Sequence, residues 1–259
     1  MTGEHREGVT GLPNPRGEVS GMAKFGVLVF PGTNCEIDVL RVLRDLLHQD
    51  AELVWYEERD LERYDAVILP GGFSYGDYLR AGAMARWTPV IEAVYAAAEK
   101  GRLILGICNG FQILTEAGLL PGALQRNRHL RYVCGWTHVR VERTDTPFTS
   151  AYRKGQVLRI PISHGEGNFY ADPDALAEIE KRGQVLLRYA TPDGQLTETA
   201  NPNGSLHHIA GIMNKAGNVM GLMPHPERAC EAVLGSEDGC GIFASMIHYL
   251  TKGRVFHVG

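Results

Sequence analysis

The chain has 259 residues, of which 44% are hydrophobic and 22% charged, enough apolar material for one large domain or two small ones. Its 26 basic and 30 acidic side chains give a net charge of −4, which gives no reason to expect a nucleic acid or an acidic membrane as partner. No apolar run approaches the roughly 18 residues that a membrane-spanning helix needs, and the N-terminus lacks the apolar core of a signal peptide.

The first 21 residues are polar, rich in Gly and Pro, and without any period. Such a segment cannot bury enough apolar surface to fold, so we expect residues 1–21 to be a disordered extension. We expect residues 22–259 to form one domain. No internal repeat is visible in them.

The first half of this domain alternates buried strands with helices. The strands are apolar throughout instead of alternating, which is typical of a parallel sheet covered on both faces. We therefore predict an α/β fold with a largely parallel sheet flanked by helices. The elements predicted in this half are strands at 24–30, 51–56, 65–69 and 103–107, and helices at 39–47 and 89–100.

The segment from about 129 to 222 has a different pattern. It carries runs rich in Thr, Val and Arg at 137–143, 157–162 and 184–190, followed by a hairpin pattern at 213–219. We predict that these runs extend the sheet with antiparallel strands and do not form a second domain. An amphipathic helix over 237–249 is predicted to complete the fold.

Cys108 lies in the most informative motif of the chain. The apolar run 103–107 ends in Gly106-Ile107-Cys108-Asn109-Gly110 and passes directly into a helical pattern, which is the pattern of a nucleophile elbow with Cys in place of Ser. We expect the flanking glycines to allow the tight turn and to leave room for a substrate. The start of the helix favours a thiolate, because its free N–H groups stabilise negative charge.

His225 and Glu227 supply the partners that such a nucleophile needs. They lie in Met223-Pro224-His225-Pro226-Glu227-Arg228, a loop stiffened by two prolines just after an apolar run. A His takes the proton of the Cys, and a carboxylate orients the His. Ten histidines make a single His uninformative, and a surface turn is the plain alternative for His225. The cysteine elbow in the same chain favours the catalytic interpretation.

Gly72 is the candidate for a second part of the site. It follows the predicted strand 65–69 in Leu69-Pro70-Gly71-Gly72, where small residues leave backbone N–H groups accessible. An oxyanion hole takes one N–H from the residue after the nucleophile and one from a neighbouring loop, so Asn109 and Gly72 are the candidates. A Gly-rich turn after a strand is common, and this motif alone is a weak signal.

The remaining cysteines are scattered, and the total of five is odd. They form no Cys-x-x-Cys pair, which argues against a disulfide framework or a zinc site and for a reducing cytoplasm. We interpret the cysteines other than Cys108 as structural. No phosphate-binding Gly-x-x-x-x-Gly-Lys motif is present, so we expect no nucleotide site in this chain.

Several segments, taken in their order along the chain, resemble those of the class I, triad-type glutamine amidotransferases. The fold of that family is flavodoxin-like. Within that family they are most similar to the glutaminase subunits of phosphoribosylformylglycinamidine synthase, over residues 24–250. Two motifs separate these glutaminase subunits from other amidotransferases with the same triad. They are Gly-Gly-Phe-Ser-Tyr-Gly-Asp and His-Gly-Glu-Gly-Asn. The segments that carry the resemblance are 30–35, 70–80, 106–112, 119–124, 161–168 and 223–228.

The resemblance implies a reaction. Cys108 would attack the side-chain amide of glutamine and release ammonia, with His225 as the proton carrier and Glu227 behind it. Gly72 and Asn109 would stabilise the oxyanion. Gln112, one helical turn after Cys108, would recognise the polar end of the substrate, although an amide there equally suits a local backbone group.

The resemblance also implies partners. Ammonia is useful only to a synthetase, so a large ATP-dependent synthetase subunit is expected, together with a small accessory subunit. ATP and magnesium are expected on the synthetase, and no cofactor or metal is expected in this chain. The segments 73–80 and 164–167 are candidates for docking. The alternatives are a stand-alone cysteine hydrolase, such as a peptidase or γ-glutamyl hydrolase, and an inactive regulatory relative.

Overall fold

The computed structural model describes residues 22–252, and the predicted extension 1–21 lies outside the described residues. A nine-stranded sheet runs through this part of the chain in the order β2-β1-β3-β4-β11-β10-β9-β6-β7. The strands of this sheet are β1 Lys24–Val29, β2 Asp50–Trp55, β3 Ala66–Leu69, β4 Leu103–Ile107, β6 Val133–Val141, β7 Val157–His164, β9 Val185–Ala190, β10 Ile209–Met213 and β11 Val219–Leu222.

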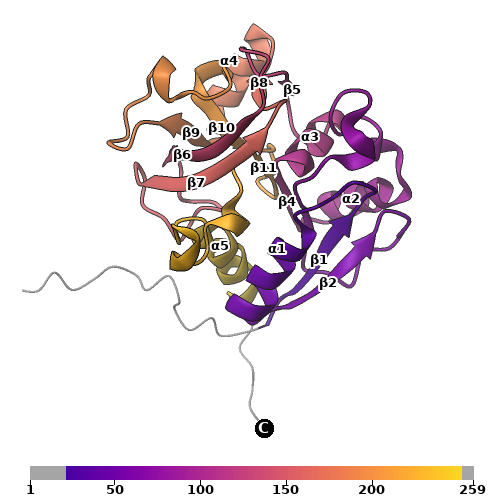
Figure 1. Ribbon diagram of the computed structural model, residues 1–259. Coiled ribbons are helices and arrows are strands. Elements are labelled where there is room, and N and C mark those ends of the chain that lie inside the picture. The colour runs from indigo at the N-terminus through magenta and orange to yellow at the C-terminus, as the bar shows by residue number, and fades with distance from the viewer. Residues whose placement is uncertain (1–21, 253–259) are drawn as a thin grey trace, which may run out of the picture.

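The sheet has a parallel and an antiparallel half. Strands β2, β1, β3, β4 and β11 pair in parallel, and β10, β9, β6 and β7 continue the same sheet with antiparallel pairs. Figure 1 shows the two halves joined through β11 and β10. The predicted α/β fold and its antiparallel extension are confirmed, including the hairpin between β10 and β11.

Helices flank the parallel half. Helix α1 (Glu36–Arg41), which continues as a π-helical turn over Val42–Leu46, packs on β1 and β2, and α2 (Pro89–Glu99) packs on β4. Helix α3 (Asn109–Glu116) lies on β3, β4 and β11, and α5 (Cys240–Thr251) ends the described fold. In Figure 1, α2 and α3 lie together on one side of the parallel strands, with α1 and α5 on the other.

Three elements were not predicted. Helix α4 (Pro173–Lys181) begins at Asp172, whose side chain accepts a hydrogen bond from the N–H of Ala175. The short strands β5 (Ala123–Gln125) and β8 (Asn168–Tyr170) form a separate two-stranded sheet. Within residues 22–252 no helix is both long and apolar enough to cross a bilayer.

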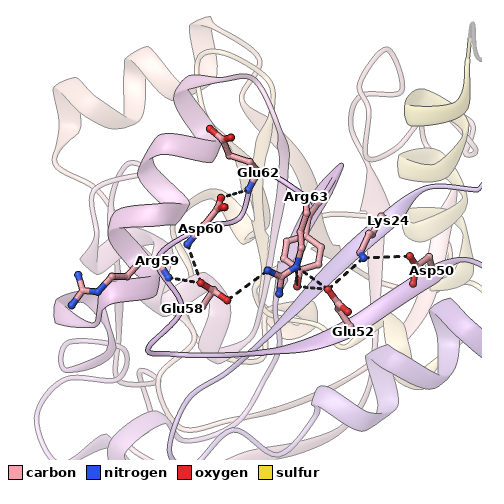
Figure 2. A network of polar contacts seen from close by, with 9 residues as sticks. Lys24, Asp50, Glu52, Glu58, Arg59, Asp60, Glu62 and Arg63 are labelled. Atoms are coloured by element: carbon pink, nitrogen blue, oxygen red, sulfur yellow. Dashed lines mark hydrogen bonds and ion pairs between the residues drawn. The ribbon is translucent and has the colours of Figure 1, made fainter.

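A charged network covers the surface at β2, away from the predicted site (Figure 2). Glu52 in β2 accepts hydrogen bonds from Arg63 Nε at 3.0 Å and from the hydroxyl of Tyr64 at 2.6 Å. Lys24 lies 3.5 Å from Glu52, and the Tyr64 ring is buried against Gly26. Exposed ion pairs of this kind contribute little individually, so the buried ring is the main anchor of the loop before β3.

Helix α3 lies unusually close to the sheet. A Cβ atom on Gly110 would lie 1.9 Å from the carbonyl oxygen of Leu69 in β3, and one on Gly221 in β11 would lie 2.1 Å from the ring of Phe111. A Cβ on Gly106 in β4 would lie 2.7 Å from the backbone of Gly110. Gly106 and Gly110 are needed because the helix backbone contacts the strands directly, and Gly221 is needed to make room for the Phe111 ring. None of the three has a positive φ.

Replacing Gly110 by Ala is expected to destabilise the fold. Ala is about 1 kcal/mol better than Gly inside a helix, but overpacking costs about 1–3 kcal/mol or more, and here the clash is with rigid backbone. Urea unfolding should therefore show a lower free energy of unfolding for Gly110→Ala. Gly135→Ala is the control, because nothing lies within 4 Å of a Cβ there, and it should change stability by less than about 0.5 kcal/mol. A Gly110→Ala variant as stable as the parent would contradict this packing.

Candidate active site

Four loops meet at the carboxyl edge of the parallel strands. They follow β1 (residues 30–35), β3 (70–77), β4 (Cys108) and β11 (223–228). The carboxyl ends of parallel strands lie on one edge of a sheet, which is where α/β proteins place their sites. The fold thus brings together the segments that carry Cys108, Gly72, Asn109, His225 and Glu227.

Cys108 occupies a strained turn between β4 and α3. Its φ is 50° and its ψ −105°, and its N–H donates to the carbonyl of Leu222 in β11 at 2.8 Å. A non-glycine residue in such a conformation costs on the order of 1–3 kcal/mol and persists only where the surroundings fix it. We expected the flanking glycines to allow the tight turn, and for the backbone conformation this is wrong. Cys108 itself takes the positive φ, and Gly106 and Gly110 provide close packing.

The Cys108 thiol is 4% exposed and lies at the start of α3. Its Sγ is 3.5 Å from the carbonyl oxygen of Ser163 in β7. The thiol thus lies at the end of the helix where backbone N–H groups have no intrahelical acceptor.

His225 and Glu227 form a buried hydrogen-bonded pair. Nδ1 of His225 lies 2.6 Å from Oε1 of Glu227, and both residues are 2% exposed. The backbone N–H of His225 donates to Pro161 O in β7 at 2.8 Å, which fixes the loop after β11. With Nδ1 engaged by the carboxylate, Nε2 is left for proton exchange with another group.

The charge state of His225 is set by opposing effects. Burial alone lowers the pKa of His225, but the charge of Glu227 and the charge of Cys108 outweigh it, so that the pKa is raised well above its ordinary value. The protonated imidazolium is therefore the favoured form of His225. This is the arrangement of a cysteine nucleophile with its base and orienting acid.

The backbone of Gly72, the predicted oxyanion donor, has a conformation that only glycine adopts readily. Gly72 has φ +152°, and a Cβ there would lie 2.7 Å from Cα of Thr33, so only glycine fits. Thr33 and Gly72 face each other in an isolated antiparallel bridge. The hydrogen bonds of this bridge are made by the neighbouring residues: Phe73 N–H donates to Gly32 O, and Asn34 N–H donates to Gly71 O. No described residue accepts from the N–H of Gly72.

The side chain of Asn109 joins this loop to α3. Its Oδ1 accepts from the N–H of Ser74 at 3.1 Å, and its Nδ2 donates to Oε1 of Gln112 at 2.9 Å. As the first residue of α3, Asn109 has a backbone N–H without an intrahelical acceptor. Gln112 is 4% exposed and donates to Glu166 O at 2.6 Å. Both ends of the Gln112 amide are thus used within the protein, and its role in substrate recognition stays a prediction.

Cys35 was interpreted as structural, but the structure places it beside the catalytic pair. Its Sγ lies 3.2 Å from Nη2 of Arg228, and a Cβ on Gly71 would contact both Cys35 Sγ and the His225 ring. Burial raises the pKa of the Cys35 thiol, although its interaction with His225 opposes the shift, so it stays protonated. Its position after β1, at the same edge as the other loops, was the signal available in the sequence.

Cys35, His225 and Glu227 also form the one group in residues 22–252 with ligand atoms close enough for a metal, within 4.8 Å of one another. The guanidinium of Arg228 next to the sulfur opposes a second cation. The imidazole and carboxylate already share a short hydrogen bond. The group is therefore better explained as a hydrogen-bonded catalytic pair with a neighbouring thiol.

His164 is not available for docking, contrary to the prediction for 164–167. It is 2% exposed, and its ring lies 3.2 Å from Asn127 Oδ1 and 3.5 Å from Asn203 Nδ2. Burial and the charge of His225 lower the pKa of His164 to about 4, so it is neutral. Asn127 also accepts from the N–H of Gly167, so this network holds the loop that contacts Gln112.

Five buried side-chain atoms lack a hydrogen-bond partner in the described part of the chain. Four of them lie in the loops after β3 and β11, which form part of the site, and the fifth belongs to Glu36, the first residue of α1. Such groups are rare in folded proteins, and a catalytic role or a bound water or ion is the usual explanation. They are Glu36 Oε2, Ser74 Oγ, Asp77 Oδ1, His225 Nε2 and Glu227 Oε2.

Comparisons with known proteins agree with this geometry. Residues 22–241 match the model of the CobB/CobQ-like glutamine amidotransferase domain. The chain is 61% identical to the phosphoribosylformylglycinamidine synthase subunit PurQ of Symbiobacterium thermophilum, over 91% of this chain and 100% of the relative. It is 58% identical to the PurQ subunit of Salinibacter ruber, over 88% and 97%. A solved structure of PurLQS from Thermotoga maritima matches with 44% identity and a TM-score of 0.79, covering 89% of this chain and 100% of the matched one.

Replacing Glu227 by Gln is expected to lower the pKa of His225. The substitution removes the charge that outweighs burial, so the buried ring should become neutral. Nitrogen-15 NMR of the imidazole should show a protonated ring well above pH 6.5 in the parent protein and a neutral ring at the same pH in Glu227→Gln. Identical titrations in the two proteins would show that Glu227 does not set the charge of His225.

Proposed function

The chain belongs to the CobB/CobQ-like glutamine amidotransferases, within the PurQ subunits of phosphoribosylformylglycinamidine synthase, and from this premise we propose how its residues produce and deliver ammonia. It is an enzyme subunit that hydrolyses glutamine. The observation that carries the proposal is the convergence of Cys108, His225 and Glu227 at one sheet edge. It occurs in a chain that is 61% identical to a PurQ subunit over the full length of that relative.

In the first half of the reaction Cys108 attacks the side-chain carbonyl of glutamine. His225 carries the thiol proton and passes it to the departing nitrogen, so that ammonia leaves and a γ-glutamyl thioester remains. Glu227 holds the imidazole through Nδ1 and stabilises its positive charge. In the second half His225 takes a proton from water, hydroxide adds to the thioester, and glutamate leaves as the proton returns to the sulfur.

Both halves pass through a tetrahedral oxyanion. We assign its stabilisation to the N–H groups of Gly72 and Asn109. Donors fixed in advance stabilise the charge without reorganising, and loss of one such donor costs about 10²–10³ in rate in related chemistry. The Thr33–Gly72 bridge and the bond from Ser74 N–H to Asn109 Oδ1 support this role, because they fix both donors relative to Cys108.

The ammonia is used by a synthetase subunit. We propose that ATP and Mg²⁺ are bound there and that this chain needs no cofactor of its own. We also propose a cytoplasmic location, where all five cysteines, which are free, stay reduced. The stand-alone hydrolase and the inactive relative are less well supported, since the relatives that match 88–91% of this chain are subunits of a synthase.

Exposed apolar side chains on the loop after β3 and on the chain before β6, here called the rim, are the surface we propose for docking the synthetase. Phe73 stacks on Tyr132 with ring centroids 6.3 Å apart, and the Tyr132 hydroxyl lies 2.7 Å from Ser163 Oγ next to the nucleophile. Tyr78 is 89% exposed and Leu79 69%. Neighbouring large apolar side chains this exposed are typical of interaction sites. The rim consists of Phe73, Tyr78, Leu79, Leu130 and Tyr132.

Cys108→Ala tests the division of labour. The reconstituted complex should lose glutamine-dependent synthesis, by a factor of at least about 10³, because no nucleophile remains. It should keep synthesis from added ammonia, measured in the same assay. Loss of the ammonia-dependent reaction as well would contradict the assignment of synthesis to the partner subunit.

Leu79→Asp tests the docking rim. A charge placed in an apolar contact should raise the Kd for the synthetase subunit by about tenfold or more, as measured by titration calorimetry. Trp55→Asp is the control, because Trp55 is 63% exposed on β2, outside the rim. Unchanged affinity in Leu79→Asp, or an equal loss in the control, would exclude the rim as the docking surface.

A further inference from the structure

Strand β7 lies at one end of the nine-stranded sheet, and its free edge faces the catalytic residues. In an antiparallel ladder every second residue directs its N–H and C=O away from the neighbouring strand. Pro161 O accepts a hydrogen bond from the N–H of His225 at 2.8 Å, and two residues further Ser163 O lies 3.5 Å from Sγ of Cys108. One strand edge thus contacts both the base and the nucleophile.

The contact with Ser163 holds the Cys108 thiol in an unreactive state. A carbonyl oxygen can only accept, so it suits the protonated thiol and not the thiolate that attacks a substrate. Nε2 of His225 is buried and has no hydrogen-bond partner among the residues that the structure describes. The thiol proton is directed to Ser163 O and not to His225, with which the sulfur has to exchange it. The sulfur therefore has to leave this oxygen before it reacts.

Tyr132 fixes Ser163 in this place. The Tyr132 hydroxyl lies 2.7 Å from Oγ of Ser163, and a Cβ on Gly165 would lie 3.6 Å from the Tyr132 ring. The ring also stacks on Phe73, with centroids 6.3 Å apart and 28° between the planes. Phe73 directly follows Gly72 in the chain. Tyr132 thus connects the loop after β3 with the strand edge that contacts the thiol.

The Tyr132 ring makes these contacts from the surface. It is 51% exposed, and the Phe73 ring on which it stacks is 42% exposed. A side chain this exposed contributes little to the core, so the loss of its hydroxyl should release Ser163 without unfolding the protein. A protein that covers the two rings would contact the same hydroxyl-bearing ring that holds Ser163.

We propose that Tyr132 is a positioning residue that, through Ser163, keeps the Cys108 thiol on the Ser163 carbonyl and thereby slows hydrolysis of glutamine by the subunit alone. The inference rests on the proposed glutaminase function and adds a restraint on its nucleophile. Because Tyr132 belongs to the rim, a docked synthetase competes for its ring and frees the thiol. Ammonia is then released chiefly where it is used.

Tyr132→Phe in the subunit without synthetase tests this restraint, because the stack on Phe73 remains and only the hydroxyl is lost. The kcat for glutamine hydrolysis should rise about 2- to 10-fold, the factor that one ordinary hydrogen bond is worth, with KM within about twofold. Alkylation of Cys108 by iodoacetamide, followed by peptide mass spectrometry, should accelerate by the same factor. Tyr249→Phe is the control, because Tyr249 is 53% exposed on α5, and it should leave both rates unchanged.

Ser163→Ala removes the other end of the same hydrogen bond and should raise both rates to the same degree. The double variant should not exceed either single one, since both changes break one contact. In the complex with the synthetase, Tyr132→Phe and the parent should have equal kcat, because docking removes the restraint in both.

Unchanged or lower rates in Tyr132→Phe, or additive effects in the double variant, would overturn the proposal. The alkylation rates decide this without any glutamine. A subunit that releases no ammonia from glutamine, alone or with the synthetase, would instead overturn the glutaminase function.

Discussion

The site depends on the direct contact between the backbone of helix α3 and the sheet beneath it. Gly110 rests on the carbonyl of Leu69, Gly106 lets the backbone of Gly110 approach β4, and Gly221 leaves room on β11 for the ring of Phe111. The helix therefore starts immediately at the end of β4, and the residue at that junction has to turn through a strained conformation. That residue is Cys108, and the strain directs its thiol away from the sheet, toward the edge where the other loops meet.

The loops around Cys108 are then tied to one another and not only to their own strands. The loop after β1 bridges Gly72 through Thr33, and Cys35 from the same loop lies against His225 and Arg228. The loop after β11 is anchored to β7 through Pro161, although β10, β9 and β6 separate β7 from β11 in the sheet. A displacement of one loop would thus disturb both the oxyanion donors and the catalytic pair. The exposed residues Tyr78 and Leu79 of the proposed docking rim follow Gly72 closely in the chain. The proposed docking surface is therefore directly linked to the loop that carries Gly72.

Much of this could be predicted from the sequence because the signals are local. Apolar runs separated by helical patterns gave the parallel strands, and the elbow at Cys108 with the prolines around His225 gave the catalytic pair. The contacts of Cys35 with His225 and Arg228 were not predicted, although the position of Cys35 after β1 was a signal. They arise between loops distant in the chain, and a motif read along the sequence does not show which loops touch. Helix α4 was missed for a different reason, since its cap at Asp172 and its Pro173 were overlooked in a segment dominated by strands.

The central claim is that Cys108 is the nucleophile that forms a covalent bond with the acyl part of glutamine. Acid quenching of the complex during turnover, followed by peptide mass spectrometry, tests it most directly. The account predicts a γ-glutamyl adduct on the peptide that contains Cys108, and no adduct on the peptide that contains Cys35. A glutamyl adduct on Cys35, or turnover of glutamine by protein in which Cys108 never carries one, would contradict it.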